Sequence, residues 1–164
     1  MYDATTHRQP AGSNTYRHDT TLRSRPDIRL TRSDRLRIEA LLRDGVLRHS
    51  PAPALLEGLL RHKLRFSCEA EDPAPADRVT TERRVTFMIS GGGARTGILC
   101  LRELCDSATD TPCLQVASLL GATLLGMRVQ QKSPLLQEDG QIATVVVLAV
   151  GPSAKPAPTQ TVPA

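Results

Sequence analysis

The stretch from Leu114 to Gly126 constrains the fold more than any other part of the chain. Its first residues alternate between apolar and polar, as Leu114 and Val116 do, which is typical of a strand. The leucines that follow fall on one face of a short helix, which Gly126 ends: Leu119, Leu120 and Leu124. A helix this short is marginal alone in water, so its leucines must pack against a larger element. The apolar run Ile142–Val150 is the candidate.

Two helices are predicted upstream, over residues 28–66. Thr31 is a candidate N-cap with Asp34 three residues later, and this helix ends before Gly45. Ser50 followed by Pro51 is a second start signal, with proline in the first helical position. An amphipathic stripe of leucines then runs to about Arg65. The two helices together predict a short helical hairpin.

A run of strands is predicted after the hairpin. Residues 67–77 contain acidic residues and prolines that break regular structure, so we expect a linker there. Residues 78–150 then hold a hairpin that turns at Gly91–Gly93, an edge strand at Lys132–Leu136, and the strand Ile142–Val150. Because Ile142–Val150 is apolar on both faces, we expect a central strand covered on each side. Helices followed by strands indicate an α+β fold, here an antiparallel sheet with one short crossing helix.

The two ends of the chain lack hydrophobic periodicity and are predicted to be disordered. Residues 1–27 form a basic arm, and residues 151–164 form a tail with four prolines. Residues 1–50 hold ten arginines and six acidic residues, whereas the rest of the chain is balanced at eleven of each sign. The arm either contacts phosphates or an acidic protein surface, or is a solvated tail.

Composition excludes several classes of function. With no Trp, two Phe and two Tyr, the core must be aliphatic, which argues against an aromatic-lined site such as that of a peptidyl-prolyl isomerase. No apolar run reaches the length of a membrane span and no secretory segment is seen, so we expect a cytoplasmic protein with no membrane contact. The cysteines lack metal-ligand spacing and are expected to be reduced thiols; Cys105 and Cys113 could pair only in an oxidising setting.

No catalytic motif is found. The run from Gly91 to Thr96 resembles a phosphate-binding loop, but it lacks the following Lys-Ser/Thr at a helix start, so a hairpin turn is the better interpretation. We therefore expect no enzyme activity, no cofactor and no metal site.

A family resemblance rests on three segments taken in order. The run Gly121–Gly126, between a strand and a closing apolar strand, resembles the signature of the C-terminal domain shared by Gre-type transcript cleavage factors and the regulators of nucleoside diphosphate kinase. The segments Leu30–Leu42 and Arg78–Phe87 are similar to the second group. The resemblance covers residues 28–150. It implies an FK506-binding-protein-like domain that binds bacterial RNA polymerase.

The resemblance also implies a docking surface. In the cleavage factors, an acidic-Ser-Pro triplet before the glycine signature contacts a coiled coil of the largest polymerase subunit. The corresponding positions are Ala117, Ser118 and Leu119, of which only Ser118 is retained. Leu119 and Leu120 are as well explained by burial in the core. The sequence also departs from the family at Gln130 and Gln131, where a Gly-Asp turn is usual.

The tip of the helical hairpin decides between the two groups. The cleavage factors carry paired acidic residues that hold a catalytic magnesium, whereas this chain offers only Asp44, next to Arg43 and close to Arg48 and His49. We therefore expect a non-catalytic regulator that binds polymerase near its secondary channel through Ala117, Ser118, Leu119 and Asp44. An effect on nucleoside diphosphate kinase would be indirect. The alternatives are an interaction module for another protein, including the kinase itself, and nucleic-acid binding through the arm.

Overall fold

The structure is a computed structural model that describes residues 27–101 and 111–153. The helices are α1 (Arg32–Arg43), the 3-10 helix η1 (Val46–His49), α2 (Pro53–Phe66) and α3 (Leu119–Leu124). The strands are β1 (Arg29–Leu30), β2 (Cys68–Glu69), β3 (Arg83–Ile89), β4 (Ala94–Cys100), β5 (Cys113–Gln115), β6 (Lys132–Leu136) and β7 (Ile142–Ser153). The predicted α+β class is confirmed. The predicted arm up to residue 26, Cys105 and the tail from residue 154 lie outside the described residues.

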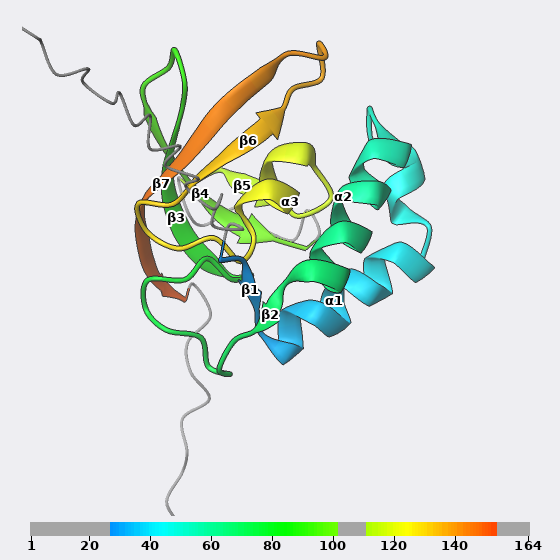
Figure 1. Cartoon of the computed structure of the whole chain (residues 1–164), viewed down its shortest axis with the longest axis horizontal. Helices are drawn as coiled ribbons and strands as arrows, with labels where there is room; N and C mark the ends of the chain where they lie inside the picture. Colours follow the sequence, from blue (N-terminus) through cyan, green and yellow to red (C-terminus); the bar gives the residue numbers. More distant parts are fainter. Residues whose placement is uncertain (1–26, 102–110, 154–164) are drawn as a thin grey trace, which may run out of the picture.

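The predicted helical hairpin is present as α1, η1 and α2 (Figure 1). Thr31 caps α1, as expected, because its hydroxyl oxygen accepts a hydrogen bond from the Asp34 backbone N–H at 3.0 Å. The predicted start of α2 at Ser50 and Pro51 is wrong. Ser50 ends η1 instead, donating its N–H to the Leu47 carbonyl at 3.0 Å, and α2 begins with Pro53 at its first position.

The main sheet has five strands in the order β5-β4-β3-β7-β6. Its neighbours are antiparallel except for β4 and β5, which are parallel, so the prediction of a wholly antiparallel sheet is wrong at this edge. β5 has only three residues and follows a long polar segment, so its direction was not set by a tight turn. The turn at Gly91–Gly93 and the edge strand β6 are confirmed. Gly91 has a φ of 82°, which suits glycine.

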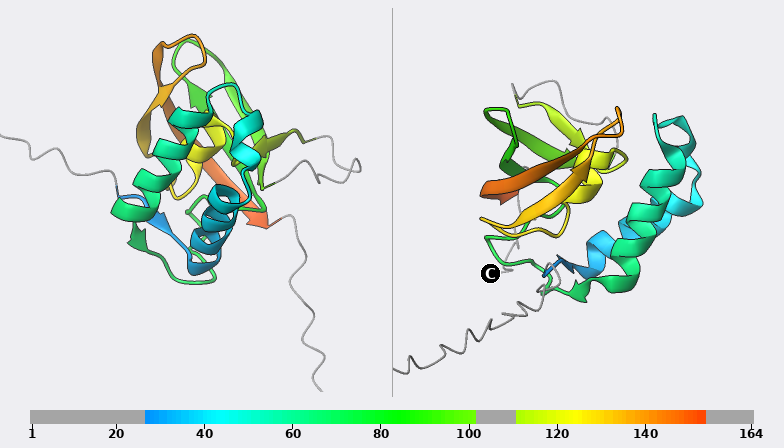
Figure 2. Two further views of the ribbon diagram at one scale, coloured as in Figure 1. Left: turned by 90° about the vertical axis from the view of Figure 1, so that its right-hand side faces the viewer. Right: turned by 45° about the horizontal axis from the view of Figure 1, so that its top comes forward.

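The helices lie on one side of this sheet, as Figure 2 shows. This arrangement overturns the prediction that β7 is covered on both faces. Along β7, Ala143, Val145 and Val147 are buried, whereas Ile142 is 74% exposed and Leu148 is 39% exposed. β7 also continues to Ser153, past the predicted end at Val150.

A single hydrophobic cluster joins the hairpin, the sheet and α3. It contains Ile38 and Leu60 from the hairpin, Phe87 and Val147 from the sheet, and Leu124 from α3. A small parallel sheet of β1 and β2 brings the two ends of the hairpin together, and β2 falls within the segment that we expected to be a linker. In the part of the chain that the structure describes, no helix is long and apolar enough to cross a bilayer.

Candidate docking site

A groove of about 490 Å³ lies where α3 begins, against the turn between β6 and β7. Ser118, Leu119 and Leu120 form one wall, and Leu135 and Leu136 of β6 form part of the opposite one. The remaining lining residues are mostly polar: Ile89, Arg95, Gln137, Glu138 and Asp139. We call this surface the docking groove. Its aliphatic floor and mixed charges suit a protein segment better than a small polar ligand.

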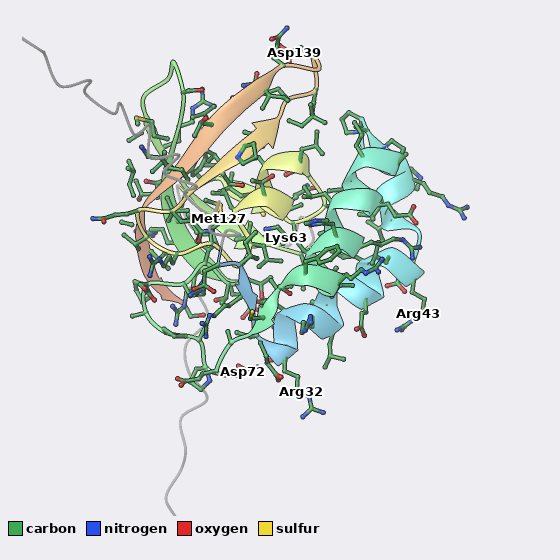
Figure 3. All side chains as sticks on the ribbon, viewed as in Figure 1. Arg32, Arg43, Lys63, Asp72, Met127 and Asp139 are labelled. Carbon is green, nitrogen blue, oxygen red and sulfur yellow. The ribbon has the colours of Figure 1, made fainter. Side chains whose placement is uncertain are left out.

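Two of the four predicted site residues lie in the docking groove, and two lie outside it. Ser118 and Leu119 line the docking groove, whereas Ala117 is half-buried and lies outside the lining. Asp44 is not in this groove either: it is an exposed residue at the C-cap of α1, with its backbone N–H bonded to the Ala40 carbonyl at 2.9 Å. Figure 3 shows the neighbouring Arg43 and the groove residue Asp139 at separate corners of the molecule.

The Ser118 hydroxyl forms two hydrogen bonds with nearby backbone groups. Its hydroxyl donates to the Gln115 carbonyl at 2.7 Å and accepts from the Gly121 N–H at 3.0 Å, which caps the first turn of α3. Both functions of this hydroxyl are therefore used within the chain. Ser118 positions Leu119 and Leu120, and these half-buried leucines present the apolar surface.

The docking groove continues towards the hairpin. A narrow crevice adjoins it and shares three of its lining residues, Ser118, Leu119 and Glu138. The other side of the crevice is formed by Ala52, which is the N-cap of α2, and by Leu56 within α2. The position of α2 thus sets the shape of one end of the groove. Sequence reasoning missed Leu135, Leu136 and Glu138, because their place beside α3 depends on tertiary packing.

Lys63 fixes α2 against α3 from within the core. Its side chain is buried, and its ammonium group donates to the carbonyl oxygens of Thr123 at 2.7 Å and Leu125 at 2.5 Å, at the end of α3 (Figure 3). These carbonyls have no intrahelical partner, so the lysine satisfies them. Burial lowers the pKa of Lys63 to about 7.

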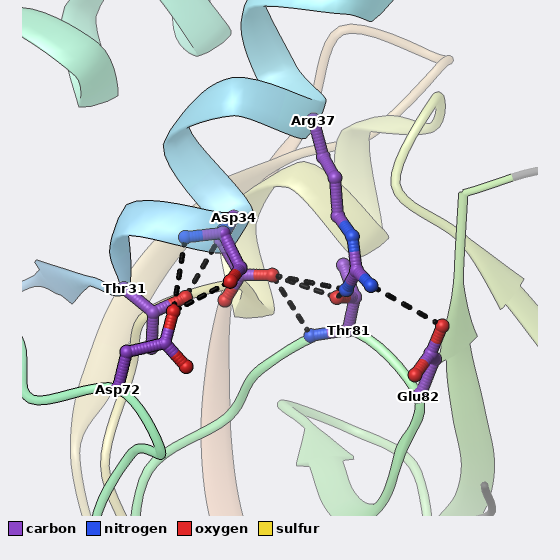
Figure 4. A network of polar contacts seen from close by, with 7 residues as sticks. Thr31, Asp34, Arg37, Asp72, Thr81 and Glu82 are labelled. Carbon is purple, nitrogen blue, oxygen red and sulfur yellow. Dashed lines mark hydrogen bonds and ion pairs between the residues drawn. The ribbon is translucent and has the colours of Figure 1, made fainter. Parts of the chain in front are cut away.

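A second polar connection joins α1 to the segment before β3 (Figure 4). The buried Asp34 carboxylate accepts hydrogen bonds from the Thr81 hydroxyl at 2.7 Å and the Thr81 N–H at 3.3 Å. Arg37 donates to the Thr81 hydroxyl and contacts Glu82 at 3.3 Å. Burial raises the pKa of Asp34, although the hydrogen bonds from Thr81 act in the opposite direction. The hairpin is thereby held in a defined orientation to the sheet.

A metal centre has no support among residues 27–101 and 111–153, where no group of three or more His, Cys, Asp or Glu side chains could hold an ion.

The described architecture is that of a Gre-type C-terminal-like α+β domain preceded by a short helical hairpin. A solved structure of a prokaryotic transcription elongation factor GreA/GreB from Nitrosomonas europaea has a similar fold. It matches with a TM-score of 0.53 and 19% identity over 76% of this chain and 98% of that chain.

Two Gfh1 structures are also similar. Gfh1 of Thermus aquaticus matches with a TM-score of 0.40 and 13% identity, over 78% of this chain and 100% of that chain. Gfh1 of Thermus thermophilus, a GreA factor homolog, matches with a TM-score of 0.38 and 15% identity, over 77% and 99%. No protein-family profile matches the sequence, and no curated protein matches it.

Proposed function

We propose that this protein is a non-catalytic transcription regulator that binds bacterial RNA polymerase near its secondary channel through the docking groove. The observation that carries the proposal is the position of this groove. It lies at the start of α3 in a fold similar to that of a GreA/GreB factor. Its lining includes Ser118 and Leu119, two of the three positions that the family resemblance aligns with polymerase contacts.

The chemistry of the groove supports a helical partner, such as one strand of the coiled coil of the largest polymerase subunit. Leu119, Leu120 and Leu136 are half-buried and gain further burial when an apolar stripe covers them. Arg95 stands in the lining together with Glu138 and Asp139, so charges of both signs can fix the direction of a bound helix. The acidic residue and the proline of the family triplet are absent here, so the groove must bind mainly through its leucines.

The chemistry at Asp44 supports regulation without transcript cleavage. Divalent cations such as magnesium prefer several oxygen ligands, usually more than one carboxylate. Asp44 is a single carboxylate that follows Arg43 at the end of α1. We therefore propose that the protein occupies polymerase without adding catalytic groups to it. Any change in nucleoside diphosphate kinase activity would then follow indirectly from transcription.

The test is equilibrium binding of the full chain to core RNA polymerase, with a GreA-type cleavage factor as competitor. We expect saturable binding that the competitor displaces. Leu119→Glu should weaken binding at least tenfold, because it places a charge on the apolar wall. Leu148→Glu is the matched control, since this leucine is 39% exposed on β7 and outside the groove.

Thermal unfolding of both variants separates lost contact from lost fold. Equal affinities of wild type and a folded Leu119→Glu variant would place the interface elsewhere. Absence of polymerase binding at low salt would remove the proposed function and favour a different protein partner or nucleic acid. The affinity for nucleic acid is then compared between the full chain and residues 27–153. A lower affinity without the basic arm would assign nucleic-acid binding to the arm.

A further inference from the structure

A second groove lies on the hairpin, between α1 and α2. It has a volume of about 560 Å³, and its apolar floor is formed by Leu42 and Leu64, which are half-buried. Glu39 and Arg43 of α1 and Arg61 and Arg65 of α2 line its rim. It shares no lining residue with the docking groove. We call this surface the arginine groove.

Helical spacing places these side chains together. Glu39, Leu42 and Arg43 lie three and four residues apart on α1, and Arg61, Leu64 and Arg65 repeat the same spacing on α2. The two helices are packed against each other, and the Arg35 guanidinium donates to the Leu64 carbonyl at 3.0 Å. Arg43 projects away from the body of the molecule (Figure 3). The arrangement is therefore a shallow apolar depression between two packed helices, with basic edges.

The charge of the hairpin is strongly positive. Residues 32–66 contain eight Lys and Arg and four Asp and Glu, and of these Asp34 and Lys63 are buried in the core. Arg61 is held in place by Glu57, whose carboxylate accepts hydrogen bonds at 2.7 and 3.0 Å. Arg43 and Arg65 are exposed on opposite walls.

We propose that the arginine groove binds an acidic amphipathic helix of a partner protein. Leucine-like side chains of such a helix would cover Leu42 and Leu64, and its carboxylates would pair with Arg43, Arg61 and Arg65. Arginine is suited to this role because its planar guanidinium binds a carboxylate through two parallel hydrogen bonds. The arginine groove shares no lining residue with the docking groove, so each surface can be altered without changing the other.

The composition of the groove favours a peptide over a nucleic acid. The floor is aliphatic, and none of the lining residues is aromatic, so the groove offers no surface on which bases stack. Glu39 on the rim repels a uniformly charged phosphate chain, whereas an amphipathic helix can place a neutral or basic residue opposite it.

The experiment uses a fluorescent designed helical peptide with leucines on one face and glutamates on the others. It is titrated with the full chain at near-physiological salt. Two further probes are a peptide with glutamine in place of glutamate and a single-stranded RNA of similar length. The test variant is the triple substitution Arg43→Glu, Arg61→Glu and Arg65→Glu. The matched control is Arg48→Glu, Arg84→Glu and Lys132→Glu, which changes the same charge at exposed positions outside the groove.

We expect saturable binding of the Leu/Glu peptide, at least tenfold weaker binding of the Gln peptide, and a loss of at least tenfold in the groove variant. The charge-matched control should lose less than threefold, and polymerase binding should be unchanged in both variants. Equal losses in both variants would show non-specific attraction and overturn the proposal. Binding of RNA but not of the peptide, or no binding by any probe, would overturn it as well.

Discussion

At the scale of single residues, the buried Lys63 is the most informative side chain. The helical stripe Leu56, Leu60 and Lys63 is spaced so that the lysine must face the core with the leucines. That spacing indicates a buried position, whereas a lysine side chain on a helix is normally exposed to solvent. The structure resolves the conflict by giving the ammonium group two carbonyl acceptors at the end of α3.

The low pKa of Lys63 predicts a stability that rises with pH. Burial lowers the pKa from 10.5 to about 7, so between these values the unfolded chain binds a proton that the folded protein has released. The contribution is therefore complete above the unfolded pKa and is lost as pH falls through 7. Its slope should approach about 1.4 kcal/mol per pH unit. The neutral amine keeps two N–H donors, so the contacts to Thr123 and Leu125 survive deprotonation.

Urea unfolding at pH values from 7 to 10 tests this prediction. Lys63→Met should remove the rise, giving a flatter dependence than that of the wild-type protein. Lys132→Met is the control, because this lysine is exposed on the edge strand β6. Parallel curves for wild type and Lys63→Met would show that the buried amine does not titrate in this range.

At the scale of elements, two glycines within helices differ in whether their surroundings leave room for a side chain. A Cβ atom at Gly121 in α3 would lie 2.0 Å from the Gln115 carbonyl oxygen, because α3 starts directly against the end of β5. Gly58 in α2 has no heavy atom within 4 Å of the corresponding position. The two residues therefore form a matched pair within helices.

Opposite effects are expected from replacing these glycines with alanine. Gly121→Ala should destabilise the protein by about 3 kcal/mol, since backbone must move to relieve the overlap. Gly58→Ala should stabilise it by about 0.5–1 kcal/mol, because alanine loses less conformational freedom in a helix. Urea denaturation of both variants checks the signs, and a stabilising Gly121→Ala would mean that α3 does not pack on β5 as described.

The elements also show what could be read from the sequence. The bounds of β6, the cap of α1 and the hairpin at Gly91 follow from local signals that the structure confirms. Local signals could not give the parallel direction of β5 or the pairing of β1 with β2, because both are set by contacts between distant segments. The one-sided burial of β7 has the same origin: its apolar residues look alike, and only the position of the helices decides which face is covered.

The candidate site divides in the same way. Ser118 and Leu119 were found because a family signature follows them directly in the sequence. Leu135, Leu136 and Glu138 could not be found, since the turn between β6 and β7 reaches α3 only in the folded protein. Asp44 was expected near the same partner, but α1 holds it outside the docking groove.

At the scale of the whole molecule, the hairpin and the sheet share one core. Ile38, Leu56 and Leu60 belong to the same buried cluster as Val85 and Val147. The polar contacts from Asp34 to Thr81 and from Lys63 to the end of α3 cross the same boundary. The docking through α3 that we propose should therefore depend on the hairpin, because α2 supports the helix that carries Leu119.

This coupling predicts that residues 27–153 unfold in one cooperative step and that residues 78–153 alone do not form a stable domain. Removing the hairpin exposes the apolar side of α3 to water, at roughly 25 cal/mol per Å² of apolar surface. The carbonyls of Thr123 and Leu125 also lose the Lys63 donor and bond to water instead. Urea unfolding of both fragments, monitored by circular dichroism, tests these two predictions, and amide hydrogen exchange provides a second measurement. A sharp transition and strong amide protection in the 78–153 fragment would instead make the sheet an independent domain.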